Sequence, residues 1–247
     1  MPISETYNMD CMDYMKSMPD KFFDLAVVDP PYGINAPNMT MGTNMNRKYG
    51  GYNGESVAQR LKKGRLNQGA GKLKDRALNR MDCTWDFTPP SEEYFRELMR
   101  VSRNQIIWGG NYFRLPPTRC IVCWDKMQPW ENFSQVELAW TSFDRPASLI
   151  RLSNTGGANK EVKIHPTQKP ISLYGWLLRK FAKPGDKILD THLGSGSSRI
   201  AAYKLGFDFY GTEIDKAYFD TEERRFQEVC LGEMRFGEHK LIQTTLF

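Results

Sequence analysis

The chain has 247 residues, with 34 Lys and Arg against 29 Asp and Glu, so its formal net charge is only +5. That length suits one α/β domain with a substantial core, and an odd number of cysteines, five, argues against a disulfide framework. No apolar run is long enough to cross a membrane and the N-terminus does not resemble a secretion signal, which predicts a soluble cytoplasmic protein.

The first informative segment is a short apolar run, Phe23 to Val28, that ends in Asp29-Pro30-Pro31-Tyr32. The run predicts a buried strand with a carboxylate at its tip. The two prolines have no amide hydrogens and a fixed φ, so they present rigid carbonyls beside an acid and an aromatic ring. Asp29 and a backbone carbonyl could accept both hydrogens of an amine on a flat ring, while Tyr32 stacks on that ring. The alternative is a strand that runs into a proline turn, with Tyr32 as ordinary packing.

A basic segment follows, over residues 35 to 82. It is rich in Gly and Asn and lacks a sustained apolar period, which predicts an inserted arm, mobile without a partner, that has no core of its own. Clustered Lys and Arg next to the Asp29 tip favour contact with the phosphates of DNA, and a solvated surface loop is the alternative. The residues predicted to contact DNA are Arg47, Lys48, Arg60, Lys62, Lys63, Arg65, Lys72 and Lys74.

Cys120 and Cys123 have the spacing of a metal or redox pair. They lie in an apolar, strand-like run, Arg119 to Trp124, without a second cysteine pair or a nearby histidine. Core packing is therefore the favoured interpretation. No metal is assigned, because ligand spacing is also absent among the histidines, which are His165, His192 and His239.

A glycine-rich turn lies far down the chain. Lys187 to Asp190 predicts a strand, Thr191 to Ser198 a turn that contains Gly194 and Gly196, and Arg199 to Leu205 a helix. The glycines allow the backbone to approach a ligand closely, and the helix N-terminus offers free amides.

A further strand, Phe207 to Glu213, ends in an acid about twenty residues beyond the glycines, where a ribose diol would be held. This spacing predicts a nucleoside cofactor. NAD is disfavoured, because Gly194 and Gly196 are not followed by the third glycine of the dinucleotide fingerprint.

Taken together, the two sites resemble the beta group of amino-methylating DNA methyltransferases, which use S-adenosyl-L-methionine and have the catalytic motif before the cofactor motif. The resemblance spans most of the chain and fails over roughly residues 35 to 82. One departure is in the cofactor loop, where the family usually has Asp-Pro-Phe and this chain has Asp190-Thr191-His192. The matching segments are Asn8 to Cys11, Met12 to Met18, Phe23 to Tyr32, Ile106 to Phe113, Phe133 to Thr141 and His165 to Pro170.

The resemblance implies an α/β fold with a doubly wound, mostly parallel, Rossmann-like methyltransferase sheet, formed by a single domain over residues 1 to 247. Both sites are then expected at the carboxyl edge of the strands. Because the motif order is circularly permuted, the strand before Asp29 must lie close to the strand before Asp190.

The resemblance also implies roles for single residues. Asp29 and the Pro30 carbonyl would grip the amine of a flipped adenine, with Pro31 and Tyr32 completing the catalytic motif. Asp190 would lie near the amino group of the cofactor, Glu213 on its ribose and Asp10 at its adenine ring. The cofactor-binding residues implied are Asp10, Cys11, Asp29, Thr167, Gln168, Lys169, Asp190, Gly194, Ser195, Gly196, Ser197, Glu213 and Ile214.

Alternatives remain for several of these assignments. Asp10 could instead cap the helix that follows it, and Trp108 and Phe143 could be core aromatics rather than contacts of the flipped base. Cytosine N4 methylation uses the same geometry but usually has Ser in place of Asp29, and RNA or protein glutamine substrates usually go with Asn there. A catalytically dead DNA-binding module is the alternative from another class.

The last residues, 240 to 247, form a tail in which Gln243, Leu246 and Phe247 resemble the peptide by which bacterial proteins bind the sliding clamp. A pocket on this domain or on a second subunit is the alternative for the two apolar residues. Relatives in the family often form dimers, so a homodimer is one alternative, and the oligomeric state, the recognition sequence and the presence of a restriction partner stay open.

Overall fold

The computed structural model describes residues 1–34, 85–128, 134–153, 161–236 and 239–242. The predicted basic arm with its DNA-contacting residues, and Gln243, Leu246 and Phe247 of the tail, lie outside the described residues. The described strands are β1 (Ser4–Tyr7), β2 (Phe23–Val28), β3 (Ser102–Trp108), β4 (Ile121–Asp125), β5 (Val136–Thr141), β6 (Ser148–Arg151), β7 (Lys187–Asp190), β8 (Asp208–Thr212), β9 (Glu233–Phe236) and β10 (His239–Ile242). The described helices are α1 (Cys11–Ser17), α4 (Glu92–Val101), α5 (Ile171–Phe181), α6 (Ser197–Lys204) and α7 (Lys216–Phe226), with short turns at η6 (Gly110–Tyr112) and η7 (Gln227–Leu231).

Eight of the described strands form one sheet in the order β1-β8-β7-β2-β3-β5-β4-β6. Parallel pairs join β1 to β8, β8 to β7, β7 to β2, β2 to β3 and β4 to β6. Only β5 runs the other way within this sheet, since it is antiparallel to both β3 and β4. The prediction of a mostly parallel sheet is therefore confirmed.

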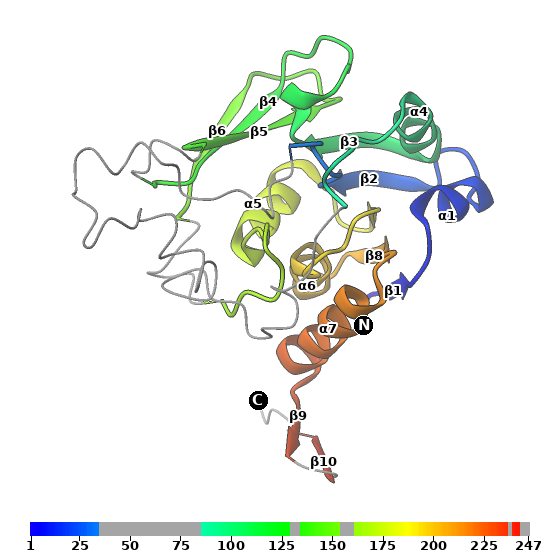
Figure 1. The fold of residues 1–247 in the computed structure, drawn as a ribbon, viewed down its shortest axis with the longest axis vertical. Helices are drawn as coiled ribbons and strands as arrows, with labels where there is room; N and C mark the ends of the chain where they lie inside the picture. Colours follow the sequence, from blue (N-terminus) through cyan, green and yellow to red (C-terminus); the bar gives the residue numbers. More distant parts are fainter. Residues whose placement is uncertain (35–84, 129–133, 154–160, 237–238, 243–247) are drawn as a thin grey trace, which may run out of the picture.

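Helices cover both faces of the sheet because side chains along a strand alternate between its faces. Leu25 and Val27 of β2 pack in one buried cluster with Leu177 of α5, whereas Ala26 and Val28 pack in a second cluster that includes residues of α1 and α4. Figure 1 separates the two helix pairs, with α1 and α4 toward the right and α5 and α6 nearer the centre. The doubly wound arrangement follows from strands that are apolar on both faces.

The carboxyl ends of neighbouring parallel strands bring the two predicted sites to one edge of the sheet. β2 pairs directly with β7, with Leu25 opposite Ile188. Asp29 follows β2, and Asp190 ends β7. The strand before Asp29 and the strand before the glycine turn are therefore neighbours, as the permuted motif order requires.

Two predicted helices begin one or two residues later than the observed ones, and each also ends one residue later. Ser197 and Ser198, predicted as the end of the turn, begin α6, because Gly196 has a left-handed backbone (φ 68°) and forms the N-cap. The first helix begins at Cys11 rather than Met12, since the Asp10 side chain accepts a hydrogen bond from the Met12 amide at 2.7 Å. The capping role considered for Asp10 is thus confirmed.

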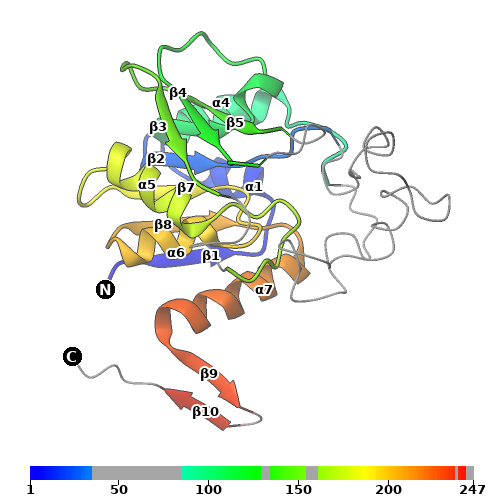
Figure 2. The same ribbon diagram turned by 90° about the vertical axis from the view of Figure 1, so that its left-hand side faces the viewer.

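Several further elements lie away from the edge where β2 and β7 end. Cys120 is fully buried and Cys123 lies within β4, partly buried, so both pack as the strand pattern indicates. In the part of the chain that the structure describes, no group of His, Cys, Asp and Glu is arranged as a metal site, and no helix is both long and apolar enough to span a membrane. Strands β9 and β10 form an antiparallel hairpin, which stands off from the main sheet beyond α7 (Figures 1 and 2).

The core under α5 gives a direct stability prediction. Leu177 is fully buried between α5 and the sheet, so Leu177→Ala should lower the free energy of unfolding by about 2–5 kcal/mol. Leu149→Ala on β6 is the matched control, because Leu149 is 56% exposed and its loss should change stability by less than about 0.5 kcal/mol. Urea unfolding measures both; equal losses would contradict the described core.

Candidate active site

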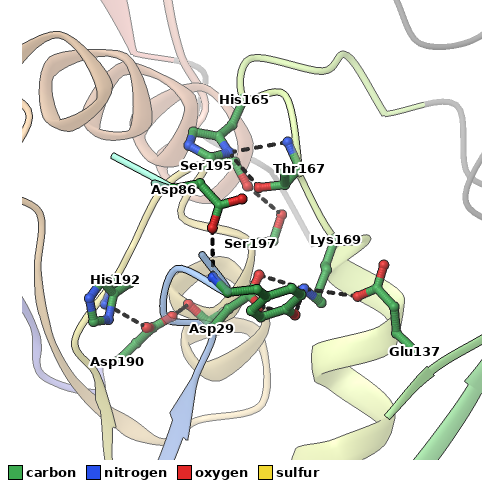
Figure 3. A network of polar contacts seen from close by, with 12 residues as sticks. Asp29, Asp86, Glu137, His165, Thr167, Lys169, Asp190, His192, Ser195 and Ser197 are labelled. Atoms are coloured by element: carbon green, nitrogen blue, oxygen red, sulfur yellow. Dashed lines mark hydrogen bonds and ion pairs between the residues drawn. The ribbon is translucent and has the colours of Figure 1, made fainter. Parts of the chain in front are cut away.

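The loop after β2 is fixed by an acid that lies outside the loop. Pro30 and Pro31 have no amide hydrogens, so the first backbone donors after Asp29 belong to Tyr32 and Gly33. Both amides donate to Oδ1 of the buried Asp86, at 2.6 and 3.0 Å. Asp86 therefore holds the shape of the loop (Figure 3). Sequence reasoning missed it, because a single acid ahead of α4 carries no recognisable pattern.

The Asp29 carboxylate is hydrogen-bonded through both of its oxygens. Tyr32 Oη donates to Oδ1 at 2.6 Å, and Lys169 Nζ donates to Oδ2 at 2.5 Å. Lys169 Nζ also lies 3.1 Å from Glu137 Oε2, and Glu137 Oε1 pairs with Lys126 Nζ at 2.9 Å. Figure 3 shows Lys169 between Asp29 and Glu137. Four buried or nearly buried groups of alternating charge thus form a row that begins at the end of β2.

Burial and the neighbouring charges set the protonation of this row. Burial raises the pKa of Asp29, and Lys169 opposes that effect. Burial alone would lower the pKa of Lys169, but Asp29 and Glu137 outweigh it and raise that pKa. For Glu137, the attraction of Lys169 and Lys126 outweighs burial and lowers the pKa. Lys169 therefore stays a cation, and it stabilises an anion on each side.

The Tyr32 ring is held by close packing with the turn after β3. It stacks on Tyr112, with ring centroids 5.0 Å apart and an interplanar angle of 15°. Gly109 has a left-handed backbone (φ 70°), and a Cβ there would overlap the Tyr32 ring. Burial, followed by the charge of Asp29, raises the pKa of Tyr32 well above its usual value. The phenol therefore remains a donor to Asp29.

The glycine turn after β7 is tied to the end of β8. Gly194 and Gly196 have left-handed backbones, with φ of 50° and 68°. The Gly194 amide donates to Glu213 Oε2 at 2.9 Å, and the Asp215 amide donates to Oε1 of the same carboxylate at 2.9 Å. Glu213 thus lies beside the glycine turn, as expected, and is oriented by two backbone donors.

Helix α7 packs against the glycine turn and donates hydrogen bonds to it, a contact that the sequence did not predict. Arg225 Nη1 donates to the Ser195 carbonyl at 2.6 Å and to Ser197 Oγ at 2.9 Å, while Nη2 pairs with Glu161 at 2.7 Å. Glu222 is fully buried, and a Cβ on Gly196 would overlap its carboxylate. Gly196 is thus required both by its backbone conformation and by the approach of α7.

Asp190 and Thr191 lie at the start of the same turn. Both Asp190 oxygens meet neutral donors, Ser198 Oγ at 2.5 Å and the His192 amide at 3.0 Å. Burial raises the pKa of Asp190 to about 7. The Thr191 hydroxyl bonds the Tyr94 hydroxyl at 2.6 Å and lies 3.0 Å from His192 Nδ1, so the residues that replace the usual Pro and Phe form their own polar contacts.

The predicted contacts of a nucleoside base lie at the neighbouring end of β1 and β8. Asp10 caps α1, and burial raises the pKa of the Cys11 thiol to about 12. The Asn8 side chain donates to the carbonyls of Glu213 and Ile214 at 2.8 and 3.1 Å. These bonds join the loop after β1 to the loop after β8. Ile214 is largely exposed.

The segment before α5 contacts both the glycine turn and the loop after β2. The His165 ring lies against Gly194, and burial lowers the pKa of His165 to about 3, so it is neutral. The Gln168 side chain bonds the backbone of Ile164 at 2.9 Å, and Thr167 bonds His165. Lys169, the third residue expected to contact a cofactor, bonds Asp29, and the cofactor contacts of all three stay a prediction.

The two aromatic residues left open by the sequence have core positions. Trp108 is fully buried in the cluster under α5, and Phe143 packs on the same cluster beside Phe181.

Known proteins that resemble this chain are DNA methyltransferases. The family model described as DNA methylase matches residues 107–224. The chain is 23% identical to the Type II methyltransferase M2.MboI of Moraxella bovis in an alignment that covers 90% of this chain and 87% of that protein.

Solved structures share the fold at low sequence identity. The putative DNA modification methylase TTHA0409 of Thermus thermophilus, in complex with S-adenosyl-L-methionine, has a TM-score of 0.51 and 15% identity, covering 92% of this chain and 95% of that one. The PvuII DNA methyltransferase, described as cytosine-N4-specific, has a TM-score of 0.54 and 14% identity, covering 91% and 87%. The predicted Rossmann-like methyltransferase fold is confirmed by these likenesses.

The packing of Tyr32 against Gly109 can be tested with a matched pair of glycines. Gly109→Ala and Gly185→Ala both place a side chain on a left-handed backbone, but a Cβ on Gly185 meets nothing within 4 Å. Each should lose about 1–2 kcal/mol of stability from the backbone alone, and Gly109→Ala about 1–3 kcal/mol more from the overlap with Tyr32. Urea unfolding measures the difference. Equal losses would show that the Tyr32 ring is free to move.

Proposed function

We propose, on the premise that the chain is a member of the N6/N4 DNA methylases, that it transfers a methyl group from S-adenosyl-L-methionine to the N6 amine of a flipped adenine in DNA. The observation that carries this proposal is the position of Asp29. Its carboxylate ends β2 next to the glycine turn of β7, so an amine acceptor and a nucleoside site adjoin at one sheet edge.

The residues at the glycine turn fit such a cofactor. Asp190 is buried and bonded by neutral donors, and its pKa is raised to about 7, so a nearby ammonium would favour its ionised form. Glu213 lies beside the turn, where the Gly194 and Asp215 amides hold its carboxylate, and each oxygen keeps a second lone pair for a ribose hydroxyl. When bound, S-adenosyl-L-methionine supplies an electrophilic methyl group on a sulfonium. We assign its binding to the turn from Asp190 to Ser197, with Glu213, Ile214, Asp10, Cys11 and Thr167 around it.

The catalytic residues would act mainly by positioning the amine. Asp29 and the Pro30 carbonyl accept its two hydrogens, and Tyr32 stacks on the base. A carboxylate oxygen has two lone pairs, so Asp29 Oδ1 can keep the Tyr32 hydroxyl while it accepts the amine. The nitrogen lone pair forms the N–C bond as the C–S bond breaks with its electrons left on sulfur. One amine proton leaves during or after the attack, with Asp29 as its nearest acceptor.

The preference for adenine rests on Asp29, since enzymes for cytosine N4 usually carry Ser at that position. The likeness to a cytosine-N4-specific enzyme is a likeness of fold and does not choose the base. A dead module is disfavoured, because Asp29 to Tyr32 and the glycine turn are both intact in the sequence and follow neighbouring strands.

Further parts of the proposal rest on the sequence alone. The basic arm would contact DNA phosphates through Arg47, Lys48, Arg60, Lys62, Lys63, Arg65, Lys72 and Lys74. The tail would bind a sliding clamp through Gln243, Leu246 and Phe247, and a second copy of the chain would help to embrace a duplex. A cytoplasmic place in a bacterial or phage-infected cell is consistent with such a substrate.

Replacement of the proposed amine acceptor tests the function directly. Asp29→Ala should lower the rate of methyl transfer to duplex DNA by about a thousandfold or more, because the amine loses its acceptor. The affinity for S-adenosyl-L-methionine, measured by calorimetry, should stay within about twofold, since the glycine turn is untouched. Asp144→Ala, at an exposed aspartate, is the matched control and should keep full activity. Equal loss of turnover and cofactor binding in Asp29→Ala would reject the assignment.

A further inference from the structure

Lys169 is committed to the catalytic motif rather than to the cofactor side of the site. Its ammonium carries three donors and has three acceptors in reach: Asp29 Oδ2 at 2.5 Å, Tyr32 Oη at 3.1 Å and Glu137 Oε2 at 3.1 Å. Asp29 and Tyr32 accept hydrogen bonds from the ammonium, whereas Glu137 Oε2 accepts none and attracts it as an ion pair.

The Lys169 ammonium is buried, so its charge depends on the acids beside it. The Lys169 side chain is only 4% exposed, and its Nζ lies 5.5 and 5.3 Å from the ring centres of Tyr32 and Trp108. A buried ammonium needs anionic partners, and Asp29 and Glu137 supply them from two different strand ends. The two acids therefore compete for one cation.

Glu137 is itself held by a second lysine. Lys126 Nζ pairs with Glu137 Oε1 at 2.9 Å, and both side chains are largely buried. Charges thus alternate from Asp29 through Lys169 and Glu137 to Lys126, which lies at the far end of the row just after β4. Removal of the charge on Glu137 therefore strengthens the net electrostatic attraction that Asp29 feels from this row.

We propose that Lys169 is a positioning residue, which keeps the Asp29 carboxylate ionised and aimed at the substrate amine, and that Glu137 tunes its strength by competing for it. This inference rests on the proposed function, because Asp29 must be an acceptor when the amine arrives. A protonated Asp29 would present a donor in place of one acceptor oxygen.

The sign of each effect follows from the groups around Asp29. Burial raises the pKa of Asp29, Lys169 lowers it, and Glu137 raises it. Removal of Lys169 should therefore raise the pKa further, whereas removal of the charge on Glu137 should lower it. The titratable groups that act on Asp29 or feel its charge are Tyr32, Tyr94 of α4, Glu137 of β5, Lys169, Tyr174 of α5 and Asp190 of β7.

Two substitutions in one row should thus shift the pH profile in opposite directions. In single-turnover methyl transfer, Lys169→Met should move the acid limb to higher pH by about one unit or more, a tenfold change in ionisation. Glu137→Gln should move it to lower pH, and Lys169→Arg should restore most of the wild-type profile. Cofactor affinity in Lys169→Met should stay within about twofold of wild type. Lys216→Met, at an exposed lysine on α7, is the control and should shift nothing.

A direct reading of Asp29 separates this inference from the function. Carbon-13 NMR of labelled aspartate carboxyls, with the Asp29 signal assigned through Asp29→Asn, follows the ionisation of Asp29 in the full chain without DNA. Its midpoint should rise in Lys169→Met and fall in Glu137→Gln. If Lys169→Met does not fold, the fall in Glu137→Gln decides.

Shifts of the same sign, no shift, or loss of cofactor affinity with an unchanged Asp29 midpoint would each overturn the role of Lys169. A wild-type chain that methylates no DNA, with the two opposite NMR shifts intact, would instead reject the proposed function and keep the Asp29 to Lys169 coupling.

Discussion

The buried ion pair between Asp29 and Lys169 is the constraint on which the site depends. It joins the loop after β2 to the segment before α5, which is 140 residues further along the chain. A carboxylate at the end of a buried parallel strand is costly to ionise unless a cation meets it. Lys169 meets that need and in turn requires Glu137, so the polar row extends across the sheet edge to Lys126.

The rest of the edge is rigid for related reasons. Asp86 fixes the loop through the two amides that follow the prolines, and Gly109 leaves the space in which the Tyr32 ring lies. At the end of β7, Arg225 binds the glycine turn and Glu222 packs under it. Backbone conformation, packing and charge therefore favour the same arrangement of the loops. A fixed arrangement is what catalysis by orientation of the reacting groups requires.

The sequence predicted what local pattern encodes. Phe23 to Val28 and Lys187 to Asp190 were found at their observed boundaries, because apolar runs that end in an acid are a strong strand signal. Their adjacency followed only from a family resemblance, and the observed β2–β7 pairing confirms it. By contrast, Asp86, Glu222 and Arg225 act on loops that are distant in sequence, and no periodicity marks such contacts. Lys169 was predicted as a cofactor-binding residue, and only the structure gives its partners within the chain, since the direction of a long side chain depends on tertiary packing.

The central claim is that Asp29 serves the amine of adenine in DNA. Single-molecule sequencing of DNA from cells that express the chain and lack other methyltransferases reports the modified base and its sequence context together. The account predicts N6-methyladenine at one recurring short sequence, and its loss when Asp29 is replaced by Ala. N4-methylcytosine at such a sequence, or DNA without any new modification, would contradict it.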